Sequence, residues 1–87
     1  MYKQIWKYDL ETRDSQIIRM PKDAQILCVQ IQFAKPRIWA LVDPKQPFED
    51  RHILIFGTGH PVFQECLYIG TFQIRNGDLV FHVFEQK

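Results

Sequence analysis

The sequence predicts an all-β fold: a small antiparallel barrel or two-layer sandwich of about six strands, with a C-terminal hairpin. Fifteen isoleucines and valines and twelve aromatic residues stand against three alanines, a balance typical of strands. Apolar and polar residues alternate with a period of two in several segments, and no segment shows a sustained helical period. Because 87 residues are too few for a second core, we expect residues 1–87 to form a single domain.

Two strands are predicted in the first part of the chain. Residues 2–10 alternate, with aromatic side chains on one side and mainly charged side chains on the other. A polar turn follows, and residues 16–20 form a second, shorter strand. We expect this strand to end at Pro21, because proline cannot donate a hydrogen bond to a strand ladder.

The next two predicted strands form a hairpin. Residues 25–33 have the clearest alternation in the chain, and residues 34–36 link them tightly to a strand over residues 37–42. Residues 43–50 hold two prolines and four charged residues, and this composition predicts the longest loop.

Two segments, residues 38–42 and 52–56, are almost entirely apolar. Continuous apolar strands are covered on both faces, whereas strands of a sheet with one solvated face alternate. An all-β chain of 87 residues has little material left for a second covering layer. We therefore expect a partner subunit to supply this cover, and the protein to be a homo-oligomer rather than a monomer.

The last strands form a β-hairpin over residues 67–85. Asn76 and Gly77 supply the two positive-φ positions of a type I′ turn, and a two-residue turn fixes the register. The predicted pairs on one face are Ile74 with Leu79, Phe72 with Phe81, Gly70 with Val83 and Tyr68 with Glu85. The predicted pairs on the other face are Arg75 with Asp78, Gln73 with Val80, Thr71 with His82 and Ile69 with Phe84.

Charge and composition argue against several classes of protein. Eleven basic residues nearly balance ten acidic ones, without the basic excess of a nucleic-acid or anionic-membrane binder. The start of the chain lacks the apolar region of a signal peptide, and no apolar run approaches a membrane span, so we expect a cytoplasmic protein. Cys28 and Cys66 lie far apart in apolar runs, which favours buried reduced thiols over a disulfide.

The segment 57–60, which reads Gly57, Thr58, Gly59 and His60, is the leading candidate for a ligand site. A glycine-rich turn at a strand end directs successive backbone N–H groups at an anion, and Thr58 and His60 add side-chain donors. The spacing is neither that of a P-loop nor that of a dinucleotide-binding turn. The alternative is a tight turn that needs glycine for positive φ, with Pro61 stiffening its exit. Residues 62–66 are compatible with one helical turn that starts at Pro61, but their apolar positions are too few to require it.

The side chains suited to metal binding or catalysis lack the required spacing. The three histidines and two cysteines fall at no recognised zinc spacing, and His82 opposite Thr71 is explained by a hydrogen-bonded or solvated imidazole. The single serine, Ser15, lies in a polar turn outside any nucleophile motif. We therefore expect no metal, no cofactor and no enzymatic activity.

The aromatic residues raise a further alternative. Trp39 close to Arg37, and Trp6 near the start, are residue types on which nucleic-acid bases stack. A place in the core or in a subunit interface accounts for them equally well, and the near-zero net charge favours this second interpretation.

Six short segments carry a resemblance to a known group of proteins. They are Ile5-Trp6-Lys7-Tyr8, Met20-Pro21-Lys22-Asp23-Ala24, Trp39-Ala40-Leu41-Val42-Asp43-Pro44, Phe56-Gly57-Thr58-Gly59-His60-Pro61, Tyr68-Ile69-Gly70-Thr71-Phe72 and Leu79-Val80-Phe81-His82-Val83-Phe84-Glu85. With these segments the chain resembles small hypothetical proteins of bacteriophage and prophage genomes, whose domain has no assigned function.

The resemblance implies a viral protein that acts in the host cytoplasm. The leading hypothesis is a non-enzymatic binder that works by sequestration or occlusion, in particular an anti-defence protein that sequesters a nucleotide immune signal. In this hypothesis, pockets between subunits hold the phosphates of a nucleotide or another phosphate-bearing small ligand, and the residues involved are Gly57, Thr58, Gly59 and His60, with charge from Arg37 or Arg51. The alternatives are an inhibitor that binds a host protein directly and a virion or assembly component.

Overall fold

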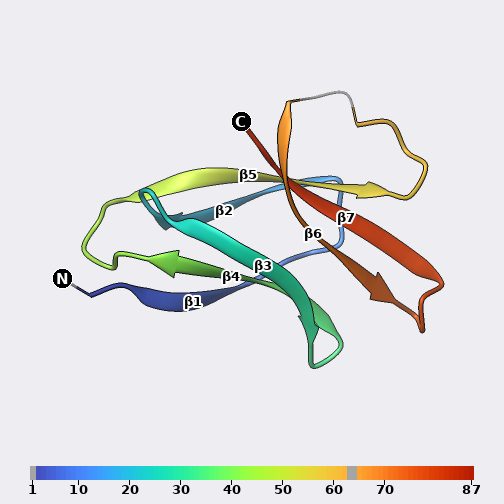
Figure 1. Cartoon of the computed structure of the whole chain (residues 1–87), viewed down its shortest axis with the longest axis horizontal. Coiled ribbons are helices and arrows are strands. Elements are labelled where there is room, and N and C mark those ends of the chain that lie inside the picture. The colour runs from blue at the N-terminus through green and yellow to red at the C-terminus, as the bar shows by residue number, and fades with distance from the viewer. Residues whose placement is uncertain (1, 63–64) are drawn as a thin grey trace.

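The computed structural model describes residues 2–62 and 65–87 and confirms the all-β class (Figure 1). It has seven strands rather than about six: β1 (Gln4–Asp9), β2 (Ser15–Pro21), β3 (Gln25–Gln32), β4 (Lys35–Val42), β5 (Phe48–Gly57), β6 (Cys66–Ile74) and β7 (Leu79–Gln86). No helix capable of spanning a bilayer occurs in the described part of the chain. The helical turn considered for residues 62–66 falls partly on residues 63–64, which lie outside the described residues, and β6 begins at Cys66.

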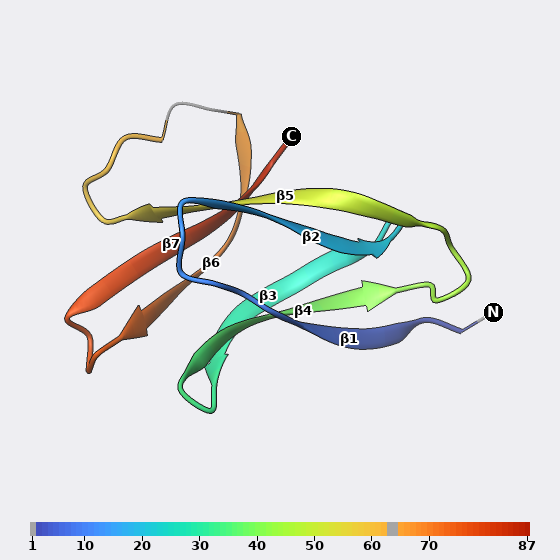
Figure 2. The same ribbon diagram turned by 180° about the vertical axis from the view of Figure 1, so that it is seen from behind.

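The strands form two antiparallel sheets, one of three strands in the order β1-β4-β3 and one of four in the order β2-β5-β7-β6. The two sheets are not closed into a barrel, so the fold is a two-layer sandwich (Figures 1 and 2). Among these strands, only β3–β4 and β6–β7 pair as neighbours in sequence. The chain therefore changes sheet after β1, after β2 and after β4.

The β3–β4 hairpin is confirmed, with a turn at Phe33 and Ala34. Both residues have positive φ, 52° and 64°, although neither is a glycine or an asparagine. The predicted loop 43–50 is shorter than expected, because β5 already begins at Phe48 and pairs there with Pro21 of β2.

The β6–β7 hairpin is also confirmed, and its register agrees with the prediction from Gly70 to Ile74. Positive φ occurs at Asn76 and Gly77 as predicted, and also at Arg75. The last ladder pair is therefore Ile74 with Leu79, and the predicted pair of Arg75 with Asp78 falls in the turn instead. Beyond Gly70 the predicted register is wrong. The register shifts between Tyr68 and Gly70, as at a β-bulge, so that Tyr68 pairs with Phe84 and Leu67 with Glu85.

The hydrophobic core lies between the sheets. Residues opposite each other in a ladder share a face, and in β4 the buried residues recur at every second position on the inner face. The largest side chains that are fully buried are Met20, Pro21, Ile38, Val42, Ile53 and Val83. The sheets approach most closely where β3 crosses β6, since a Cβ on Gly70 would lie 2.7 Å from Cγ1 of Val29.

The two apolar segments differ in how they are covered. In β4 the alternate residues Ile38 and Ala40 are buried in the core, whereas Trp39 is half-buried on the outer face of the three-stranded sheet. In β5, Ile53 and Ile55 face the core, and Leu54 is only 8% exposed on the opposite face. The chain itself therefore covers both faces of β5 at Leu54, but it leaves the outer face of β4 partly exposed at Trp39.

Candidate functional site

The 57–60 turn follows directly from β5. Its closing hydrogen bond runs from the backbone N–H of His60 to the carbonyl oxygen of Gly57, at 3.1 Å. Gly59 has a φ of +90°, a conformation that L side chains rarely adopt, so glycine is required there. The His60 ring packs over Gly57, because a Cβ on this glycine would lie 3.2 Å from Cε1 of His60. Both glycines thus shape the turn.

A chain of hydrogen bonds connects this turn to the hairpin. The Thr58 hydroxyl lies 2.7 Å from Nε2 of His82, and the other ring nitrogen, Nδ1, lies 2.9 Å from the Thr71 hydroxyl. Thr71 is in turn 2.6 Å from the Tyr68 hydroxyl. A neutral imidazole has one donor and one acceptor nitrogen, so hydroxyls, which both donate and accept, satisfy either tautomer. The predicted juxtaposition of His82 and Thr71 is confirmed.

Aromatic rings lie beside this chain of hydrogen bonds. Phe84 packs edge-on against Phe56 and Tyr68, with ring centroids 5.7 Å and 5.3 Å apart. The ladder pairs place these residues on the outer face of the four-stranded sheet, and Tyr68 is 60% exposed. We call Thr58, His60, Tyr68, Thr71, His82, Phe56 and Phe84 together the outer-face site.

A hollow of about 350 Å³ adjoins the outer-face site. It lies between the 57–60 turn and the start of β2, and is lined by Ser15, Leu54, Phe56, His60 and Pro61 among others. The site therefore combines an exposed tyrosine ring, a concave apolar surface and a row of hydroxyl and imidazole groups. Such a combination is suited to a ligand with one planar part and one polar part.

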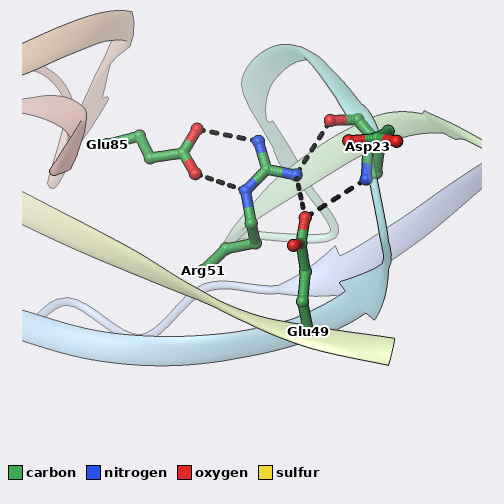
Figure 3. Close-up of polar contacts among 5 residues, drawn as sticks. Asp23, Glu49, Arg51 and Glu85 are labelled. Carbon is green, nitrogen blue, oxygen red and sulfur yellow. Dashed lines mark hydrogen bonds and ion pairs between the residues drawn. The ribbon is translucent and has the colours of Figure 1, made fainter. Parts of the chain in front are cut away.

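Arg51 is the first of the two predicted arginines, and it lies apart from the turn. It is six residues before Gly57 on β5, about 20 Å at the rise of a strand, and on the inner face. Its Nη2 donates to Oε1 of Glu85 at 2.9 Å and its Nε donates to Oε2 of the same carboxylate (Figure 3). Its Nη1 donates to the carbonyl oxygen of Ala24 at 2.8 Å and lies 3.7 Å from Glu49.

The neighbours of Arg51 favour the charged form of its guanidinium. The hydrogen bonds to Glu85 raise the pKa of its guanidinium above the ordinary value, against the effect of burial. Glu49 also accepts the backbone N–H of Asp23 at 3.2 Å, so the cluster ties β5 and β7 to the turn between β2 and β3 (Figure 3). This arginine therefore joins two strands of the four-stranded sheet to the turn that leads into β3.

Arg37 is the second predicted arginine, and it belongs to the other sheet. It lies on β4, on the outer face of the three-stranded sheet, and forms an ion pair with Asp9 of β1. Its Nε is buried and has no hydrogen-bond partner within residues 2–62 and 65–87. Four of the six predicted residues therefore form the turn, and within one chain the two arginines lie elsewhere.

Residues that sequence reasoning left out complete the site. His82, Thr71 and Tyr68 join the turn because β7 pairs with both β5 and β6. The hairpin register indicated the contact between His82 and Thr71, but the pairing of β5 with β7 has no local signal in the sequence. Across residues 2–62 and 65–87, no three His, Cys, Asp or Glu side chains are grouped so that they could hold a metal. Cys28 and Cys66 are half-buried thiols in different sheets.

Comparison with known proteins identifies a family. The family model described as a domain of unknown function (DUF7352) matches residues 1–87, so the chain belongs to that family over its whole length. No curated protein and no solved structure matches it significantly.

Proposed function

We propose that this member of the DUF7352 family is a non-enzymatic binding protein whose ligand lies at the outer-face site. The observation that carries the proposal is the row of hydroxyl and imidazole groups beside the exposed Tyr68 ring. A ring of this kind stacks on a planar group, worth about 1–3 kcal/mol for a nucleic-acid base. The neighbouring Thr58, Thr71 and His82 offer hydrogen bonds to the polar part of the same ligand.

Binding is favoured over catalysis by the group that faces the histidine. Thr58 and His82 have the contact of a nucleophile with its base. In hydrolytic triads, however, the second ring nitrogen faces a carboxylate that stabilises the imidazolium. Here it faces the neutral hydroxyl of Thr71, which orients the ring without balancing a positive charge.

The sharper form of the proposal is that the protein is a phage anti-defence protein that sequesters a nucleotide immune signal in the host cytoplasm. The phosphates would lie at the 57–60 turn, at backbone N–H groups other than that of His60, which closes the turn, and the base would lie on Tyr68. Arg51 is engaged with Glu85 on the inner face, so we assign it no ligand contact. Arg37 faces outward from the other sheet, and only a neighbouring subunit would bring it to the turn.

Self-association is part of this proposal, and the surface of the chain supports it. The accessible surface is 6058 Å², whereas a folded monomer of 10.4 kDa exposes about 5,400 Å². Several apolar side chains are more than half exposed, among them Ile5, Ile17 and Leu67. Contact with further subunits would cover such side chains.

Calorimetric titration with a panel of cyclic nucleotides and ADP-ribose-type nucleotides tests the proposal. We expect one class to bind, and to be recovered chemically intact after dissociation. Tyr68→Ala and His82→Ala should weaken binding about tenfold or more. His52→Ala is the matched control, because His52 is an exposed histidine on the same strand as the turn but pairs with Ile17 at a distance from it. Absence of heat with the whole panel would refute nucleotide binding, and recovery of a cleaved nucleotide would refute sequestration.

A further inference from the structure

The tip of the β3–β4 hairpin presents an unusual residue. Phe33 is 83% exposed, so its ring contributes little to the core. Its backbone has a φ of 52°, and the next residue, Ala34, has a φ of 64°. Two-residue hairpin turns with positive φ strongly prefer Asn-Gly, Asp-Gly or Gly-Gly, and a bulky side chain in this region of φ is strained. The fold thus holds an aromatic ring in solvent at a cost in stability, a pattern that points to a function for the ring.

A hollow adjoins the same hairpin tip at Ala34, the residue after Phe33. It has a volume of about 410 Å³ and lies between the two hairpin tips. Its walls are Ile31 and Ala34 on one side and Gln73, Ile74 and the turn from Arg75 to Gly77 on the other. Figures 1 and 2 both show the two hairpin tips at the same end of the molecule. Since an apolar cavity of about 150 Å³ accepts benzene, the hollow has room for a phenyl ring.

We propose that this end of the sandwich is the self-association surface, and that two copies of the chain meet there about a twofold axis. Each copy inserts Phe33 into the hollow of the other. The inference rests on the self-association in the proposed function and assigns it a place. A second copy is the occupant that the geometry selects, because the exposed Phe33 ring and the wall of the hollow at Ala34 belong to the same hairpin tip. A twofold axis between them brings each ring to the other's hollow.

The charges on this end are also self-complementary. Arg75 and Asp78 lie on the same exposed turn, separated by two residues. A twofold axis that exchanges the two tips places Arg75 of each copy near Asp78 of the other. Leu79 and Ile31, each 38% exposed, lie next to the turn and to the hollow and extend the apolar contact.

The area indicates a modest affinity. A buried phenylalanine removes about 150–250 Å² from solvent, and two of them fall short of the roughly 1,200 Å² at the low end of stable interfaces. The flanks of the hairpin tips must supply the remainder, so we expect association at micromolar rather than nanomolar concentration.

Sedimentation equilibrium over a range of micromolar concentrations tests the assignment with the variant Phe33→Asn. Asparagine tolerates positive φ, so this variant should unfold at the same temperature as the wild type or higher while it associates about tenfold or more weakly. Tyr2→Asn is the matched control, since Tyr2 is a 90% exposed aromatic residue just before β1. The N-terminus lies at the other end of the molecule from the hairpin tips (Figure 1), so this substitution should leave association unchanged.

A charge exchange provides a second, independent test. Arg75→Asp and Asp78→Arg should each associate poorly alone, because like charges then face each other, whereas an equimolar mixture should regain the wild-type mass. A wild-type chain that remains a single copy at every concentration would refute self-association altogether. A wild-type dimer that persists in Phe33→Asn, or mixed charge variants that stay apart, would refute this surface and leave self-association standing.

Discussion

Removing the cation from the ion pair between Arg51 and Glu85 should destabilise the sandwich strongly, and Arg51→Met tests this. Both side chains are 16% exposed on the inner face. The substitution keeps most of the aliphatic length but removes the two hydrogen bonds to Glu85 and the one to Ala24. It leaves the Glu85 carboxylate between the sheets without its cation.

The expected loss follows from the burial of the pair. Removing one partner of a fully buried ion pair costs about 3–5 kcal/mol, because the other charge is left uncompensated. Since 16% of each side chain is still exposed, water compensates part of this, and we expect a loss of about 2–4 kcal/mol. A chain of 87 residues has a total stability of about 4–13 kcal/mol, so Arg51→Met removes a considerable fraction.

Urea denaturation at neutral pH, followed by tryptophan fluorescence, measures the loss. Arg13→Met is the matched control, because the side chain of Arg13 is 62% exposed and pairs with that of Glu11, which is 70% exposed. Its loss should change stability by less than about 0.5 kcal/mol. The double variant Arg51→Met with Glu85→Leu should recover most of the stability, since an apolar pair of similar size replaces the charges. A loss below about 0.5 kcal/mol in Arg51→Met, or a double variant no better than the single one, would contradict the interpretation.

Two further predictions concern the core. The Tyr8 hydroxyl is buried and has no hydrogen-bond partner within the described residues, and burial raises the pKa of this phenol above its ordinary value of 10.0. The contribution of this group to stability is therefore constant below pH 10.0 and declines as the pH rises through the raised pKa. Tyr8→Phe should remove that decline, and at pH 7 it should be neutral or stabilise the fold by up to about 1 kcal/mol. A lower urea midpoint for Tyr8→Phe than for the wild type at pH 7 would contradict this prediction. Gly70→Ala should cost about 1–3 kcal/mol of stability, because the new Cβ would lie 2.7 Å from Cγ1 of Val29. Adding Val29→Ala to this variant should relieve part of the clash. Equal stability losses in Gly70→Ala and in the double variant would show that the contact with Val29 does not cause the loss.

The strands themselves were largely predictable, because they depend on local patterns. Alternation and turn residues indicate the hairpin around Asn76 and Gly77, and the ladder agrees from Gly70 to Ile74. The shift beyond Gly70 was not predictable, because alternation of side chains is compatible with either register. Next to the shift, β6 lies against β3, and a Cβ on Gly70 would lie 2.7 Å from Cγ1 of Val29.

The candidate site was predictable in part, for a related reason. Glycine spacing identifies the 57–60 turn, and Gly59 needs glycine. The role of Arg51 depends on Glu85, which is 34 residues away in the chain and comes close only through the pairing of β5 with β7. Sequence patterns describe which residues lie on one face of a strand, but not which strand lies alongside.

The order of the strands has a consequence for the nascent chain. β1 and β2 leave the ribosome before their ladder partners β4 and β5, which are translated later. The first hairpin that can close during synthesis is β3–β4, and the N-terminal segments can only add to its edge or wait for β5. Until translation reaches that point, the apolar side chains of the first twenty residues stay available to chaperones or to neighbouring polypeptides.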